Sequence, residues 1–383
     1  MKKTVACILG LLCGASVLAF SACKEEVSAA TLNSFESYDE LRLVKPENCV
    51  GSMELNTDKK YVTEGDGSLK FHIDRTSALA AAGWVVSSAD TGEVGVQHMN
   101  AALIFLPKKE YGQLGKVDEF CVDIFNANAY DTQLIFYAND VNETVMFSCT
   151  RTLKAGEMNE VSIPLNGHFY ENHSTNVSNY KLVFAGAGVD ETYYVDDFQA
   201  ILGNGGKKSA EKSAADWEIL SFDSESDYNY VNPYSYTLTP AVKSYYSEDK
   251  LYSKDGGSLC LEMLPFNGME EKRSSASQKA TANGCGVEIY TGVISAKIAE
   301  ADKIILDAYL AAAGEKTLTV TLTDGTNWQT ERFTLHGNEW TEIAVARKEN
   351  GVAFDRLTQF VVTVDTTDNK ETTKIYLDDL RYE

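Results

Sequence analysis

Apolar and polar residues alternate along several short segments of the chain. In one segment Phe120, Val122 and Ile124 share one side of the alternation, and residues 304–309 repeat the same pattern. A period of two is the spacing of a β-strand whose two sides meet different surroundings. Residues 134–138 and 318–322 alternate in the same way. No segment shows convincing helical periodicity, so the pattern predicts an all-β protein.

The chain repeats itself at the scale of a domain. Each half opens with Ser-Phe-acid-Ser, at residues 34–37 and 221–224. Each half closes with Tyr-Val/Leu-Asp-Asp, at residues 194–197 and 376–379. The opening and closing phrases are separated by nearly the same distance in both halves, which indicates two copies of one domain.

Short alternating strands in copies of about 170 residues predict two tandem antiparallel β-sandwiches of the jelly-roll type. The segment between the copies is rich in Gly, Lys, Ser and Ala and has no apolar period, so we expect a flexible linker and loosely joined domains. The expected divisions are a signal peptide at 1–22, a tether at 23–31, domain one at 32–201, a linker at 202–216 and domain two at 217–383.

The N-terminus has the features of a secretory signal. Lys2 and Lys3 precede a short apolar stretch that ends in Ser21-Ala22-Cys23. The arrangement resembles a bacterial lipoprotein signal, which implies that Cys23 receives the lipid; an ordinary signal with a chance cysteine is the alternative. No later segment approaches the ~20 apolar residues of a membrane-spanning helix. We therefore expect an extracytoplasmic protein of the cell envelope, attached to the membrane by its lipid alone.

Charge and motifs narrow the function. The formal net charge is −22, which disfavours nucleic acid and other polyanions as partners but leaves neutral ligands and metal ions open. The five histidines show no metal-ligand spacing, and no Gly-x-Ser-x-Gly elbow is present. Carboxylates are numerous, but the separations that glycoside hydrolysis needs cannot be taken from sequence. We expect a protein without catalytic activity.

The repeated phrases, in their order, resemble jelly-roll carbohydrate-binding modules and their galactose-binding-like relatives. Besides the opening and closing phrases, the resemblance rests on a Glu-Gly-Asp-Gly-Ser-Leu-Lys segment at 64–70, its counterpart at 255–259, and a Trp-Thr-Glu-Ile strand at 340–343. It covers nearly the whole chain after the signal, once per domain. It implies a sandwich fold and carbohydrate as a ligand, although the same sandwich also serves adhesion and spacing.

The resemblance also implies a structural calcium ion between the first and last strands. Its ligands would be Glu36 with Asp196 or Asp197 in domain one, and Asp223 with Asp378 or Asp379 in domain two. Carboxylate oxygens suit calcium, and adjacent carboxylates repel each other unless a cation intervenes. The alternative is a solvated acid pair that caps an edge strand.

A glycan site needs an exposed aromatic ring beside amides or carboxylates. In domain one, strand alternation predicts that Asp123, Phe125, Gln133 and Tyr137 share the non-core face of one sheet. In domain two the corresponding face carries Tyr309 and several threonines and offers a thinner platform. Trp328 lies between Asn327 and Gln329 at an expected hairpin tip and is the best single candidate. Trp340, by contrast, is expected in the core.

The sequence thus predicts a non-catalytic surface lipoprotein that binds neutral polysaccharide or oligosaccharide through at least one of its modules. The alternative is a structural or adhesion lipoprotein that contacts a protein partner. An exposed aromatic with adjacent amides would favour the first reading, and a broader apolar patch the second.

Overall fold

A computed structural model describes residues 28–47, 51–81, 101–107, 117–141, 145–165, 177–186, 188–202, 218–224, 227–235, 242–254, 256–265, 285–289, 291, 298–365 and 371–383. The predicted signal, Cys23 and nearly all of the predicted linker lie outside these residues. Within the described part of the chain, no helix is long and apolar enough to cross a membrane.

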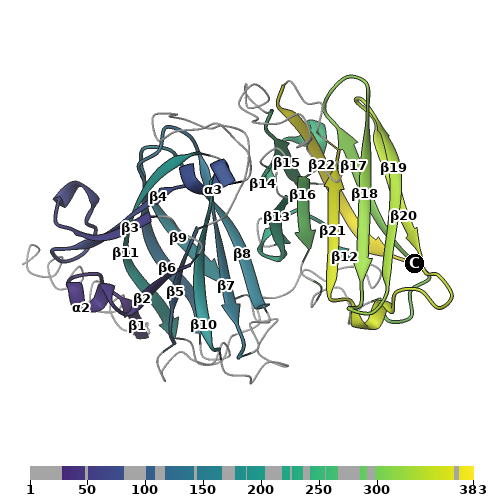
Figure 1. Ribbon diagram of the computed structural model, residues 1–383. Helices are drawn as coiled ribbons and strands as arrows, with labels where there is room; N and C mark the ends of the chain where they lie inside the picture. Colours follow the sequence, from purple (N-terminus) through teal and green to yellow (C-terminus); the bar gives the residue numbers. More distant parts are fainter. Residues whose placement is uncertain are drawn as a thin grey trace, which may run out of the picture.

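The protein is all-β, and four antiparallel sheets form two sandwich domains that lie side by side (Figure 1). The predicted fold class is confirmed. Strands β1 to β11 build domain one and β12 to β22 build domain two. The only helices described are short: α2 (Tyr38–Leu41), α3 (Thr76–Ala81) and the 3₁₀ turns η1 (Lys59–Tyr61), η3 (Asp227–Tyr230), η4 (Lys250–Tyr252) and η5 (Phe354–Arg356).

Domain one pairs a sheet of six strands with a sheet of five. The first has the order β3-β4-β11-β6-β9, and β1 also pairs with β11. Its strands are β1 (Ser28–Asn33), β3 (Gly51–Asn56), β4 (Ser68–Asp74), β6 (Val117–Asn126), β9 (Met158–Pro164) and β11 (Asp190–Leu202). The second has the order β2-β5-β10-β7-β8. Its strands are β2 (Val44–Glu47), β5 (Ala101–Phe105), β7 (Thr132–Asn139), β8 (Val145–Leu153) and β10 (Asn179–Ala185).

Domain two repeats this plan. Its first sheet has the order β14-β15-β22-β17-β20, with β12 also paired to β22. Its strands are β12 (Glu218–Leu220), β14 (Val242–Ser247), β15 (Ser258–Met263), β17 (Lys303–Leu310), β20 (Trp340–Ala346) and β22 (Thr373–Tyr382). The other sheet has the order β13-β16-β21-β18-β19. Its strands are β13 (Val231–Ser235), β16 (Cys285–Ile289), β18 (Glu315–Thr323), β19 (Trp328–His336) and β21 (Gln359–Val364).

The alternating residues fill the two cores. Phe120, Val122 and Ile124 are buried between the sheets of domain one, as the period of two predicts. The opening phrases also anchor the core, because Phe35 and Phe222 are both buried. Each of these phenylalanines has a left-handed backbone, with φ near 56° and 58°.

The closing Asp-Asp phrases mark a β-bulge in the last strand of each domain. The register shifts between Asp196 and Gln199 in β11, and at the same place in β22. The second aspartate takes a left-handed backbone in both copies, with φ 43° at Asp197 and 54° at Asp379. Asp is one of the few residues that tolerates this conformation, which gives the repeated acid pair a structural reason.

Two sequence expectations need correction. β6 and β7 belong to opposite sheets of domain one, so Asp123 and Phe125 do not share a face with Gln133 and Tyr137. The alternation gives the side of a strand correctly but not the sheet that the strand joins. In addition, β1 begins at Ser28, inside the segment expected to be a tether, because residues 28–31 pair with the end of β11.

Candidate functional site

The outer face of the β18–β19 pair carries an exposed tryptophan beside rows of threonines. Trp328, the first residue of β19, is 67% exposed. Outward-facing residues pair across the two strands: Thr321 with Thr330, Thr319 with Arg332, and Thr317 with Thr334. The hydroxyls of Thr321 and Thr330 lie 3.3 Å apart and share a hydrogen bond. We call this surface the threonine face. Its outward-facing residues are Thr317, Thr319 and Thr321 of β18 and Trp328, Thr330, Arg332 and Thr334 of β19.

Trp328 stands on a firmly bonded turn. The Asp324 carboxylate accepts hydrogen bonds from the backbone N–H groups of Ala353 (2.9 Å), Asn327 (2.7 Å) and Thr326 (2.8 Å). These bonds hold the pKa of Asp324 well below its usual range. The side-chain amide of Asn327 donates hydrogen bonds to the Asp324 carboxylate and to the carbonyl of Gly351. The turn therefore fixes the backbone that presents the indole ring.

Gln329 does not flank Trp328 on the exposed side. Neighbouring strand residues point to opposite faces, and Gln329 is buried, with its Nε2 donating to the carbonyl of Ala346 at 2.8 Å. Its Oε1 is buried without a hydrogen-bond partner in the described residues. The amide neighbour that the sequence placed beside Trp328 is thus on the other side of the strand.

Phe125 belongs to an aromatic cluster on the outer face of the first sheet of domain one. Tyr61, from η1, stacks on Tyr194 of β11 with ring centroids 3.8 Å apart. Phe125 meets Tyr61 edge-on at 4.9 Å, and the ammonium of Lys60 lies 4.8 Å from the Tyr61 ring. The cluster fastens the 3₁₀ turn to the sheet and leaves little of Phe125 exposed.

Domain two repeats the cluster around Tyr309. The ring of Tyr252, in η4, stacks on that of Tyr376 with centroids 4.4 Å apart, and its centroid lies 5.3 Å from that of Tyr309. Trp340 lies 5.4 Å from Tyr309 on the same outer face and is partly exposed, so its expected place in the core is wrong. Sequence reasoning missed the turn tyrosines because they lie outside any alternating run.

Gln133 and Tyr137 lie between the two domains. Gln133 is 1% exposed, and both its donor and its acceptor bond to domain two. Burial raises the pKa of Tyr137, and the carboxylate of Glu288 in domain two adds to the effect. These side chains are therefore used in a contact within the chain.

The first aspartate of each closing phrase is occupied by the backbone. Asp196 accepts hydrogen bonds from the N–H groups of Thr63 (2.8 Å), Glu64 (3.2 Å) and Asp197 (2.8 Å). Asp378 accepts from Lys254 at 2.8 Å and Asp379 at 3.0 Å in the same way. Burial raises the pKa of both carboxyls, that of Asp378 to about 7. Both aspartates tie a loop to the bulge.

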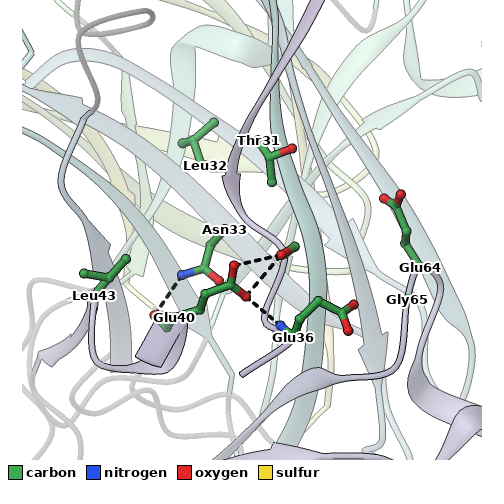
Figure 2. Close-up of a pocket in the computed structure, with 9 residues that line it drawn as sticks. Thr31, Leu32, Asn33, Glu36, Glu40, Leu43, Glu64 and Gly65 are labelled. Atoms are coloured by element: carbon green, nitrogen blue, oxygen red, sulfur yellow. Dashed lines mark hydrogen bonds between the residues drawn. The ribbon is translucent and has the colours of Figure 1, made fainter. Parts of the chain in front are cut away.

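A pocket of about 400 Å³ opens beside the acids of domain one (Figure 2). Glu36, Glu40 and Glu64 line it, together with residues of β1 and the following turn. Glu40 is held by the Ser34 hydroxyl and the Glu36 N–H, whereas Glu36 accepts one hydrogen bond from Asp66 N at 2.8 Å. The nearby Asp197 carboxylate raises the pKa of Glu64.

In domain two, an acid beside the bulge is paired with two cations. Lys254 Nζ and Arg381 Nη1 each lie 2.6 Å from the Asp307 carboxylate, which is the counterpart of Asp123. Arg381 also lies 3.0 Å from Glu342 and 3.8 Å from Asp379. Asp223 accepts from Gly257 N. In neither domain do three His, Cys, Asp or Glu side chains gather to hold a metal ion, as far as the described residues extend.

Comparison with known proteins finds distant structural likenesses. No protein family and no curated protein matches the chain. The tandem family 22 carbohydrate-binding modules of Xyn10C from Paenibacillus barcinonensis are 11% identical, with a TM-score of 0.30, over 94% of this chain and 98% of theirs. The family 11 module of a Clostridium thermocellum cellulase is 11% identical, with a TM-score of 0.31, over 47% of this chain and 97% of its own. An exo-β-agarase is 14% identical, with a TM-score of 0.33, over 52% of this chain and 28% of its own.

Proposed function

We propose that this protein binds neutral glycans without transforming them, and that the threonine face of domain two is the binding surface. The observation that carries the proposal is the exposed ring of Trp328 on a firmly bonded turn beside rows of outward-facing hydroxyls. The C–H patches of a sugar ring pack on an aromatic face, while threonine hydroxyls can donate to and accept from sugar hydroxyls. A polysaccharide chain can lie along the two strands and use both.

The charges near Trp328 favour binding over hydrolysis. Asp324 is the carboxylate closest to Trp328 in the turn, and three backbone N–H groups hold it in its ionised form. A carboxylate with a lowered pKa cannot act as the general acid that glycoside cleavage requires. The site can therefore retain a glycan but has no proton donor at this position.

A protein partner is the second candidate function. Such a partner would use a contiguous apolar patch of several hundred Å². The large hydrophobic residues that are exposed in the described part of the chain are Tyr38, Leu43, Leu106, Val141, Leu251 and Trp328. Leu43 and Leu106 flank the paired Val44 and Phe105 and so lie together at the end of β2 and β5 in domain one. A protein partner would use that end, whereas the glycan proposal concerns Trp328 in domain two.

The experiment is retention of the intact protein on a panel of neutral polysaccharides, compared with two variants. Trp328→Ala should lower the affinity at least tenfold, which is about 1.4 kcal/mol, without changing the melting temperature. Leu251→Ala removes another large exposed apolar side chain, which is 76% exposed, and should bind like the wild type. Equal retention of all three proteins, or no retention on any glycan, contradicts the proposal.

Calcium is proposed for domain one alone. Although no three acidic side chains of the described residues gather as a metal site, Glu36 and Glu64 line the pocket, and Asp197 raises the pKa of Glu64 by a repulsion that a cation would relieve. Asp196 fits the role poorly because its oxygens already accept backbone hydrogen bonds. In domain two, Arg381 lies 3.8 Å from Asp379, and the oxygens of Asp378 already accept backbone hydrogen bonds. Both aspartates therefore fit the ion less well, which leaves Asp223 without a second suitable acid beside it.

We further propose that a lipid on Cys23 attaches the protein to the cell envelope. The support is the lipoprotein-like signal at the N-terminus. A single acyl chain binds membranes weakly, so stable retention needs the several chains of a lipoprotein. Cys23→Ser should move the protein from the membrane fraction to the soluble fraction. If the wild type incorporates no labelled fatty acid, the proposed anchor is wrong.

A further inference from the structure

The side-chain amide of Gln133 bonds to a strand edge of the other domain. Ser244 N donates to Gln133 Oε1 at 2.9 Å, and Gln133 Nε2 donates to the Ser244 carbonyl. Gln133 Nε2 also lies 3.1 Å from the Tyr228 hydroxyl. All three residues are buried, and Ser244 is 0% exposed. One glutamine therefore satisfies both backbone groups of a residue on β14.

Strand β8 makes a second set of contacts with β13. Thr150 Oγ1 donates to the carbonyl of Val231 at 3.1 Å and lies equally close to Asn232 Oδ1. Asn232 Nδ2 donates to Ser148 Oγ at 2.9 Å. These four residues are also buried. In Figure 1 the domains meet where β8 lies beside β13 and β14.

Both β13 and β14 are the end strands of their sheets. An end strand presents a row of unpaired N–H and C=O groups that can pair with another chain. A buried group of this kind that lacks a partner costs about 1 to 3 kcal/mol. Gln133 supplies the two bonds that a neighbouring strand would supply to Ser244, and Thr150 supplies one to Val231. Domain one thereby covers strand edges of domain two.

We infer that the outer face of β7 and β8 is a docking site for the β13 and β14 edges of domain two, so that the tandem is one rigid unit and not two loosely joined modules. The contacts are directional hydrogen bonds between buried groups, which fix one orientation in a way that apolar contact alone does not. Ile135 and Val183 are buried on the same outer face of domain one, although no core of their own sandwich lies there. The equivalent face of domain two stays open at β18 and β19.

The test measures amide hydrogen exchange at Ser244 in the full chain. Its N–H points away from β15 and toward Gln133, so only the docked state protects it. In the wild type this amide should exchange as slowly as the N–H groups bonded inside the sheet. Gln133→Leu keeps the bulk of the side chain but removes all the hydrogen bonds that this side chain makes to domain two. It should speed amide exchange at Ser244 at least tenfold and enlarge the radius of gyration in solution scattering.

Thr317→Leu is the matched control, because Thr317 occupies the position of Gln133 in domain two and is exposed. It should leave both readouts unchanged. Slow exchange inside β7 and β10 will show that Gln133→Leu remains folded. Exchange of Ser244 at the rate of an open edge in the wild type overturns the inference. A radius of gyration that is the same in the wild type and in Gln133→Leu, with Ser244 still protected, overturns it as well.

Discussion

The same sheet face has different surroundings in the two domains. The outward positions of β7 hold Gln133, Ile135 and Tyr137, and those of β18 hold Thr317, Thr319 and Thr321. The first set lies in the contact with domain two, and the second set lies on the threonine face near Trp328. The docking face of domain one and the exposed face of domain two therefore differ at three outward side chains of one strand. The core residues on the other side of that strand keep the same pattern in both domains.

The acids near the bulge differ between the domains as well. Asp307 has two cationic partners, whereas its counterpart Asp123 has none among the described ion pairs and burial raises its pKa. Gln199 occupies the position of Arg381. Domain two therefore pairs the acid beside its bulge with cations of its own side chains, whereas domain one shows no such pair at Asp123 among the described residues.

The largest expected effect of a mutation on stability concerns a buried ion pair in domain one, which domain two lacks at the equivalent position. Arg75 Nη1 lies 2.6 Å from Glu191, and the two side chains are 3% and 0% exposed. Thr373 occupies the position of Glu191 in domain two. Arg75→Met should lower the free energy of unfolding by about 3 to 5 kcal/mol because it leaves a buried charge unpaired.

The control for that variant is Arg75→Met combined with Glu191→Gln, which removes the charge as well. Denaturant unfolding should show that the double variant recovers a substantial part of the loss. Recovery of nothing would mean that packing, and not the unpaired charge, causes the effect.

The next largest effect should be that calcium stabilises domain one and not domain two. A ligand that binds only the folded state stabilises it by about 2.7 kcal/mol at a hundredfold excess over Kd. Chelation should therefore lower the melting temperature of the wild type, and Glu64→Gln with Asp197→Asn should abolish this response. Asp379→Asn in domain two should preserve it. Identical melting curves with chelator and with excess calcium contradict the proposal.

A smaller effect on stability should differ between the two domains. Asp307→Asn removes the charge that Lys254 and Arg381 share, and should cost about 2 kcal/mol, as expected for hydrogen bonds to a charged group. Asp123→Asn removes a half-buried charge without a cationic partner, and should leave stability unchanged or raise it. Unfolding with chelator present measures both. Equal losses would show that the cations of domain two do not distinguish the sites.

The sequence predicted what repeats and missed what is long-range. Alternation and the repeated phrases give the strands, the two sandwiches and the buried Phe35 and Phe222, because these depend on local periodicity. They do not give the partner of β6 or β7, since strand pairing joins residues far apart in the chain. They also do not show that Gln133 meets Ser244. The one available signal was Ile135, an apolar residue on the side expected to face solvent.

The most direct measurement is a nuclear magnetic resonance titration of the full chain with a glycan retained in the panel. The indole N–H of Trp328, identified by its absence in Trp328→Phe, should shift together with the amides of Thr317 to Thr323. The side-chain amide of Gln133 should not move, because domain two covers it. Shifts confined to domain one, or saturation by the glycan with the Trp328 signal unmoved, would contradict a binding surface on the threonine face.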